Sequence, residues 1–196
     1  MTGDTNRARQ SATSRVTCHA SPPVSQPFRQ PPAVDEQQRR PMPPDEVEQP
    51  PEDFYRTYMG GSAMGVYYVL KETPPHTPAL SPESVLTFMV SVVTGASISG
   101  QSRINVNARS PLTNAIGDSQ AGGFIPAQLK FAGFDGIVVT GKAPRPVYLY
   151  IHDREFELHD AKSLLGKVTG EAEDMIRAEL NNPKVEILQH GPAAEQ

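Results

Sequence analysis

The chain has 196 residues, 37% of them hydrophobic and 20% charged, with 20 prolines and 15 glycines. This length permits one ordinary domain together with unstructured sequence. The formal net charge of −4 argues against a protein that binds nucleic acid through bulk positive charge. The single cysteine, Cys18, excludes an internal disulfide and any site that needs several thiolates from this chain.

The longest apolar run covers residues 85–93 and is interrupted by Thr87 and Ser91. It is much shorter than the roughly 20 apolar residues that cross a bilayer. The N-terminus also lacks the apolar segment of a secretory signal. We therefore expect no membrane association and predict a cytoplasmic protein.

The N-terminal part of the chain differs from the rest in composition, because proline pairs recur there among Gln, Arg, Ser and Glu. These pairs are Pro22-Pro23, Pro31-Pro32, Pro43-Pro44 and Pro50-Pro51. Such a segment buries too little apolar surface to offset its loss of conformational entropy on ordering. We predict that residues 1–52 form a disordered, Pro-rich tail, a weak candidate ligand for an aromatic groove. A folded domain is expected over residues 53–196.

The first predicted element of that domain is a short helix after Gly60-Gly61, with Ser62 as its N-cap. Pro74 and Pro75 end it. The apolar run 85–93 then predicts a buried strand. Residues 103–109 alternate between polar and apolar side chains, which is typical of a strand with one solvent-exposed face.

The C-terminal half of the chain continues with strand and helix patterns. The expected elements are a strand at 136–140, a hairpin of 146–151 and 155–158 with its turn at 152–154, a helix at 169–180 capped by Thr169, and a last strand at 184–188. Strands interspersed with few helices predict the α+β class, with mainly antiparallel sheets.

The segment 94–123 joins predicted strands and is rich in glycine. This segment contains two arginines, Arg103 and Arg109, and a single carboxylate, Asp118. Glycine allows backbone N–H groups to approach a ligand closely, so an anionic ligand is one interpretation. The other is that these glycines are ordinary turn formers, because 117–123 matches neither a P-loop nor a dinucleotide fingerprint.

Other chemically reactive residues form no convincing site in the sequence. His152 and His159 flank the predicted hairpin, but two imidazoles without a third ligand make a poor metal site. Ser110 and Ser119 lack an evident base, so no catalytic triad is defensible. We assign no catalytic residue and no metal ligand.

A series of motifs is spread over the predicted domain: Gly60-Gly61 before a helix, Ser110-Pro111-Leu112-Thr113, and the segments 80–84, 117–123, 129–139, 141–143, 146–151 and 191–193. In the order and spacing of these motifs the chain resembles the N-terminal domain of the tungsten-dependent aldehyde ferredoxin oxidoreductase family. The resemblance covers residues 53–196. It implies an α+β fold that forms a platform beneath a tungsten (or molybdenum) bis-pterin cofactor whose phosphates share a magnesium ion.

Within this resemblance, cofactor-binding positions are carried over one by one. Arg103 matches an arginine between the pterin and an iron–sulfur cluster, and Ser119, Gln120, Ala121, Gly122 and Gly123 match the backbone that approaches pterin and magnesium. Arginine would offer fixed donors that lysine does not reproduce. The chain departs from the family pattern at three places: Ser62-Ala63 replaces Arg-Gly, Gln120-Ala121 replaces Asn-Ser, and Pro126 stands in a helix start that usually contains glycine. The family's opening β-hairpin is also expected to be missing.

The activity that the resemblance implies is oxidation of an aldehyde to a carboxylic acid, with electrons passed through a 4Fe-4S cluster to ferredoxin. The cluster cysteines and the acid/base residues belong to downstream domains of the family. The chain is therefore expected to act only with those domains or with a partner subunit, and to be inactive when isolated. The alternative is a non-catalytic, truncated remnant or an interaction module.

Overall fold

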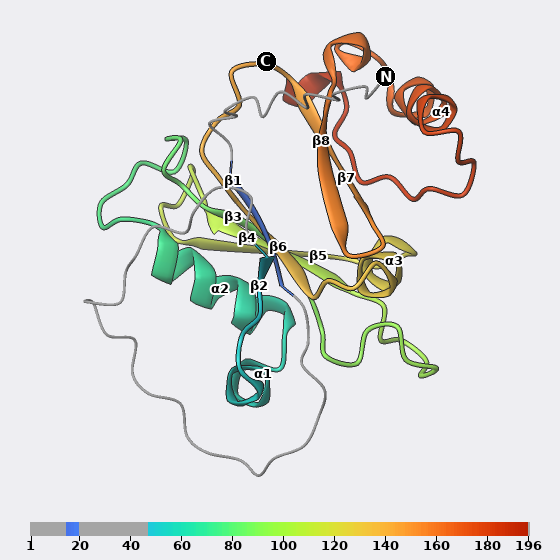
Figure 1. Cartoon of the computed structure of the whole chain (residues 1–196). Coiled ribbons are helices and arrows are strands. Elements are labelled where there is room, and N and C mark those ends of the chain that lie inside the picture. Colours follow the sequence, from blue (N-terminus) through green and yellow to red (C-terminus); the bar gives the residue numbers. More distant parts are fainter. Residues whose placement is uncertain (1–14, 20–46, 196) are drawn as a thin grey trace, which may run out of the picture.

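The computed structural model of the chain describes residues 15–19 and 47–195 and confirms the predicted α+β class (Figure 1). A six-stranded sheet has the order β2-β1-β6-β3-β4-β5, and β7 and β8 form a separate two-stranded sheet. The strands are β1 (Arg15–His19), β2 (Val47–Glu48), β3 (Leu86–Val90), β4 (Ile104–Arg109), β5 (Ile116–Ala121), β6 (Gly136–Thr140), β7 (Val147–His152) and β8 (Glu155–Asp160). The helices are α1 (Glu52–Tyr58), α2 (Gly61–Glu72), α3 (Ile125–Phe131) and α4 (Thr169–Glu179), with 3-10 turns at Lys162–Leu164 and Pro192–Ala194.

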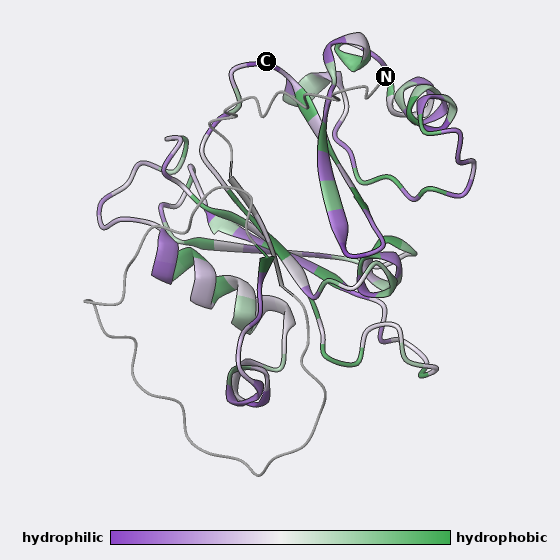
Figure 2. Ribbon diagram, in the orientation of Figure 1, coloured by the Kyte–Doolittle hydropathy of each residue, from purple (hydrophilic) through white to green (hydrophobic). Residues whose placement is uncertain are grey.

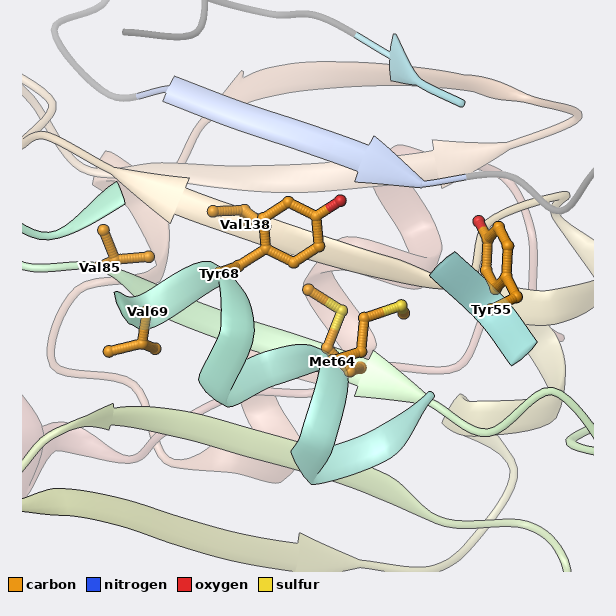
Figure 3. Close-up of a cluster of buried hydrophobic side chains, with 7 residues drawn as sticks. Tyr55, Met64, Tyr68, Val69, Val85 and Val138 are labelled. Atoms are coloured by element: carbon orange, nitrogen blue, oxygen red, sulfur yellow. The ribbon is translucent and has the colours of Figure 1, made fainter. Parts of the chain in front are cut away.

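One face of the six-stranded sheet is covered by α1 and α2 (Figures 1 and 3). Met64 and Tyr68 of α2 pack there on Met89 and Val138 of the sheet, together with Tyr55, Val69 and Val85. Since Met64 and Met89 are completely buried, this helix is held mainly by apolar contact. Removal of such side chains from water is the dominant favourable contribution to folding.

The opposite face of the sheet carries a second apolar cluster. Val90 and Ile104 pack there with Leu129 of α3 and Phe134, and the β7–β8 hairpin adds one of its own faces. The central strands β3 and β6 consist mainly of hydrophobic residues, as expected for strands whose two sets of side chains both meet apolar layers (Figure 2). The hairpin turn at Asp153 and Arg154, with φ of 44° and 66°, has the twist typical of two-residue hairpin loops.

Part of the segment predicted as a disordered tail lies in regular structure. Arg15–His19 forms β1, which pairs with β6, and α1 begins at Glu52. The physical reason is the sheet itself: without β1, the backbone groups of β6 would form an unpaired edge. Val47–Glu48 of the predicted tail forms β2, which pairs with β1. Residues 1–14 and 20–46 of the tail lie outside the described residues.

Two details of the predicted C-terminal half are wrong. Residues 184–188 form no strand, since they have no partner strand in the described structure. The Thr169 side chain is not the cap of α4, because the N-cap position is Val168 and no side chain caps it. Ser62 likewise lies inside α2, whose N-cap is Gly60.

None of the helices in residues 47–195 combines the length and the apolar character of a membrane span.

Buried tyrosine hydroxyls make the stability of the fold sensitive to high pH. Burial is the first cause that raises the pKa of Tyr55, Tyr67 and Tyr68 above the usual 10.0. Burial, a hydrogen bond to Glu179 and the charge of Glu179 raise the pKa of Tyr148 to about 12. A group whose pKa is raised in the folded state keeps its stabilising contribution below the unfolded pKa and loses it as the pH rises towards the folded value.

We therefore expect the free energy of unfolding to be constant just below pH 10 and to fall above it. The measurement is urea unfolding at a series of alkaline pH values, with phenolate absorbance followed in parallel. Replacement of Tyr148 by Phe removes one of these groups, so the variant should lose less stability than the original chain between pH 10 and pH 12. An equal loss in both proteins would contradict the assignment.

Candidate functional site

A polar layer lies between α2 and the last two strands of the sheet. Asn105 and Asn107 point from β4 towards α2 and are 7% and 0% exposed. The predicted solvent-exposed face of this strand is therefore wrong. The helix comes this close because Gly61 and Gly65 face the two asparagines, and a Cβ at Gly65 would overlap Asn107 Oδ1.

The polar layer is linked by hydrogen bonds from strand to helix to strand. Asn105 Nδ2 donates to Ser62 Oγ at 2.7 Å, and Ser62 Oγ donates to both carboxylate oxygens of Asp118 at 2.9 Å. Asn107 Nδ2 donates to Asp118 Oδ1 at 3.1 Å. No described residue donates to Asn107 Oδ1, which is buried. The exposed edge strand β5 is thus tied to the first turn of α2.

The predicted cofactor-binding residues lie at one end of the β4–β5 pair. Ile104 is paired with Ala121, so Arg103, just before β4, and Gly122, just after β5, come side by side. A hydrogen bond from Ser102 Oγ to the Gly123 carbonyl, 2.7 Å long, closes this end. Arg103 is exposed, and its guanidinium has no hydrogen bond or ion pair with another described residue.

The structure corrects the prediction of a glycine loop at 117–123. Residues up to Ala121 form β5, and only Gly122, Gly123 and Phe124 connect this strand to α3. Side chains alternate between the faces of a strand. Gln120 therefore shares the α2 face with Asp118, whereas Ser119 and Ala121 point to the other face. The backbones of the predicted cofactor-binding residues therefore lie close together, but their side chains point to different faces of the sheet.

The N-terminus of α2 points towards the same end of the strands. Gly65 lies against Asn107 and Gly61 against Asn105, so the helix axis runs back along β4 in the direction of Arg103. No side chain caps this helix, and its first turn contains no acidic residue. A helix N-terminus of this kind favours an anion, since its first N–H groups carry partial positive charge. Arg103 and the start of α2 thus lie at the same end of the strands.

The histidines of the hairpin are placed as expected, but with an additional group between them. His159 Nε2 lies 3.0 Å and His152 Nε2 3.9 Å from the two oxygens of Glu157. Even so, within residues 15–19 and 47–195 no three His, Cys, Asp or Glu side chains are arranged to hold a metal ion.

A cavity of about 880 Å³ lies on the other side of the sheet. Its lining is mainly apolar and comes from the hairpin, α3, α4 and the sheet, including Phe88, Ile104 and Leu149. None of the predicted cofactor-binding residues reaches it. It is a gap between the layers of the second apolar cluster, on the face of the sheet opposite to α2, and Ile104 at the start of β4 lines it.

Sequence reasoning missed the roles of Asn105 and Asn107. It named Ser62 only as a helix cap and as a departure from the family pattern, and Asp118 only as the carboxylate of its segment. A signal for them was present. Gly61 and Gly65 are four residues apart, so they share a helix face, and Asn105 and Asn107 are two apart, so they share a strand face. Two glycines on one helix face, opposite two asparagine side chains on one strand face, indicate that the helix packs close to the strand and that hydrogen bonds link the two.

The fold and this site define an α+β domain in which an exposed arginine and the uncapped N-terminus of α2 lie at one end of the β4–β5 pair. The family described as "Aldehyde ferredoxin oxidoreductase, N-terminal domain" matches residues 45–196. The chain therefore belongs to the aldehyde ferredoxin oxidoreductase family.

Two relatives are tungsten-containing aldehyde ferredoxin oxidoreductases. That of Pyrococcus furiosus is 42% identical over 149 residues, which are 76% of this chain and 25% of the relative. That of Pyrococcus abyssi is 41% identical over 144 residues, which are 74% of this chain and 24% of the relative. The chain spans about a quarter of the length of these relatives.

A solved structure shows the same fold. It is the active site complex BamBC of benzoyl coenzyme A reductase in complex with 1,5 dienoyl-CoA, with a TM-score of 0.65 and 28% sequence identity. The match covers 86% of this chain and 23% of that chain.

Proposed function

We propose that this chain is the cofactor-platform domain of an aldehyde ferredoxin oxidoreductase-like enzyme. The phosphates of a tungsten (or molybdenum) bis-pterin, with their magnesium ion, would bind at the end of β4 and β5, between Arg103, the Gln120–Gly123 backbone and the first turn of α2. When bound, the cofactor supplies the two-electron chemistry that converts an aldehyde to a carboxylic acid. The chain's own residues bind and orient it.

The observation that carries this proposal is the exposed guanidinium of Arg103, which pairs with no residue that the structure describes, at the same end of β4 as an uncapped helix N-terminus. An arginine without a carboxylate partner can give its planar set of donors to a phosphate. Gly122 and Gly123 add no side chain, and an added Cβ would meet no described atom within 3.4 Å at either position. The residues present therefore fit the phosphate part of such a cofactor.

Other parts of the reaction need residues that the described chain does not supply. A 4Fe-4S cluster takes four thiolates, and the chain has one cysteine, Cys18, which lies in β1. The cluster and the contact with ferredoxin are therefore assigned to the region that forms the rest of the relatives, either as further domains or as a partner subunit. The exposed apolar side chain of Phe124, which follows Gly123 directly and is 72% exposed, is suited to such a contact.

The experiment is to produce the chain together with the remaining three quarters of the Pyrococcus furiosus relative, in cells supplied with tungstate, and to measure tungsten and pterin in the purified complex. We expect the complex to retain both. Arg103→Ala should reduce the retained pterin at least about tenfold, since a charge-assisted phosphate contact contributes roughly 1.5–3 kcal/mol, and Arg103→Lys should restore part of it.

The matched control is Arg145→Ala, which removes an arginine 52% exposed on another part of the surface. It should leave pterin retention unchanged. Equal retention in the Arg103→Ala complex would refute the phosphate site. A complex that never contains pterin or tungsten, with the original chain present, would favour the alternative of a non-catalytic domain.

A further inference from the structure

The carboxylate of Asp118 is the centre of the polar layer beneath α2. It accepts hydrogen bonds from Ser62 Oγ and Asn107 Nδ2, and Ser62 in turn accepts one from Asn105. All of these donors are uncharged. Asp118 is exposed, and within the described residues it takes part in hydrogen bonds and in no ion pair.

The position of Asp118 connects two parts of the proposed phosphate site. It stands in β5 two residues before Gln120, and through Ser62 it holds the first turn of α2. The strand itself is at the edge of the sheet, paired on one side with β4. An edge strand without a second neighbour depends on such side-chain links to keep its place.

We propose that Asp118 is a positioning residue: by its hydrogen bond with Ser62 it fixes the edge strand β5 against the N-terminal turn of α2, and so sets the distance between Arg103, the Gln120 backbone and the helix N-terminus. This inference rests on the proposed function for its effect on phosphate. The link between strand and helix stands independently of any ligand.

Two effects of Asp118 on an anion have opposite signs, and this makes the inference testable. Its charge repels a phosphate bound near Gln120, whereas its hydrogen bonds preserve the geometry that the phosphate needs. If charge were the only effect, Asp118→Ala would bind an anion more tightly than the original chain. If positioning dominates, the same variant binds more weakly.

The first measurement is hydrogen exchange of the backbone amides of residues 117–122 in the chain without ligand. Asp118→Ala and Ser62→Ala should each accelerate exchange about tenfold, because each removes the hydrogen bond to a charged acceptor. Since the two changes break the same link, the double variant should exchange no faster than the faster single variant. Asp118→Asn keeps an acceptor for Ser62 and should restore most of the protection.

The second measurement is the affinity for inorganic pyrophosphate by titration calorimetry. We expect Asp118→Ala and Ser62→Ala to weaken binding about tenfold, because the loss of one hydrogen bond to a charged group corresponds to a change in affinity of about that size. Asp118→Asn, which keeps the link and removes the charge, should bind pyrophosphate more tightly than the original chain. Asp174→Asn, the same chemical change at an exposed site on α4, is the control for both measurements.

The outcomes separate this inference from the proposed function. Unchanged exchange in Asp118→Ala and Ser62→Ala, with native unfolding midpoints, overturns the positioning role. Tighter pyrophosphate binding by Asp118→Ala also overturns it. Faster exchange in both variants, with no pyrophosphate binding by any protein, supports the strand-to-helix link and counts against the phosphate site.

Discussion

Replacement of Gly60 by Ala is expected to lower the free energy of unfolding by about 3–5 kcal/mol. Gly60 has a φ of +81° and a ψ of −163°, a conformation open almost only to glycine. A Cβ there would overlap the Val90 carbonyl oxygen and come within 2.9 Å of Ser91 Cα. Both are backbone atoms of the central sheet, so rotation of a side chain cannot relieve the contact. Backbone strain and overpacking each cost about 1–3 kcal/mol, and here they add.

The measurement is the urea unfolding midpoint, with Gly170→Ala as the matched control. Gly170 lies in the first turn of α4 and has no atom near the position of an added Cβ. Alanine there should change the free energy of unfolding by no more than about 0.5 kcal/mol, or raise it slightly, because alanine has the higher helix propensity. If Gly60→Ala proved as stable as Gly170→Ala, the close approach of α2 to the sheet would be wrong.

Gly60 also shows what was predictable from the sequence. Paired glycines before an apolar helical pattern correctly indicated the start of α2. The choice of Ser62 as N-cap was wrong, because capping rules consider only neighbours in sequence. The Ser62 hydroxyl finds its acceptor in Asp118, 56 residues away, and local patterns carry no information about such a partner.

The same reasoning separates the confirmed strands from the missed ones. β3, β4, β6 and the hairpin have strong period-two or apolar patterns and were predicted close to their bounds. β5 was missed, because Gly117, Asp118 and Ser119 have low strand propensity and the strand forms through pairing with β4. β1 was missed for a related reason: it is an isolated stretch in a Pro-rich segment, and only the free edge of β6 favours it. In both cases a distant partner decided the structure.

The candidate site was predictable in position but not in geometry. The family resemblance placed Arg103 and residues 119–123 in one region, and the structure brings their backbones to one end of β4 and β5. It does not follow from sequence that Ser119 and Gln120 point to opposite faces. That depends on β5 being a strand. The role of Asp118 depends further on the approach of α2, which only the three-dimensional packing reveals.

The second large effect is expected for Asp135, a buried carboxylate between α3 and β6. Asp135 is 2% exposed. Its carboxylate forms an ion pair with Lys130 and accepts a hydrogen bond from the Tyr55 hydroxyl. Replacement of Asp135 by Ala leaves a partly buried ammonium and a buried hydroxyl without this acceptor. Removal of one member of a buried pair costs about 3–5 kcal/mol. We expect a loss of that size in urea unfolding.

Three variants separate charge from hydrogen bonding at this position. Asp135→Asn keeps an acceptor for Tyr55 and should lose less stability than Asp135→Ala. Tyr55→Phe should lose about 1 kcal/mol, the net contribution of one hydrogen bond. The double variant Lys130→Met with Asp135→Asn removes the unpaired charge, so it should be more stable than Asp135→Ala, because the cost lies mainly in a buried charge without its partner. If Asp135→Asn and Asp135→Ala lost the same amount and the double variant recovered nothing, the loss would come from packing around Asp135 and not from its pair with Lys130.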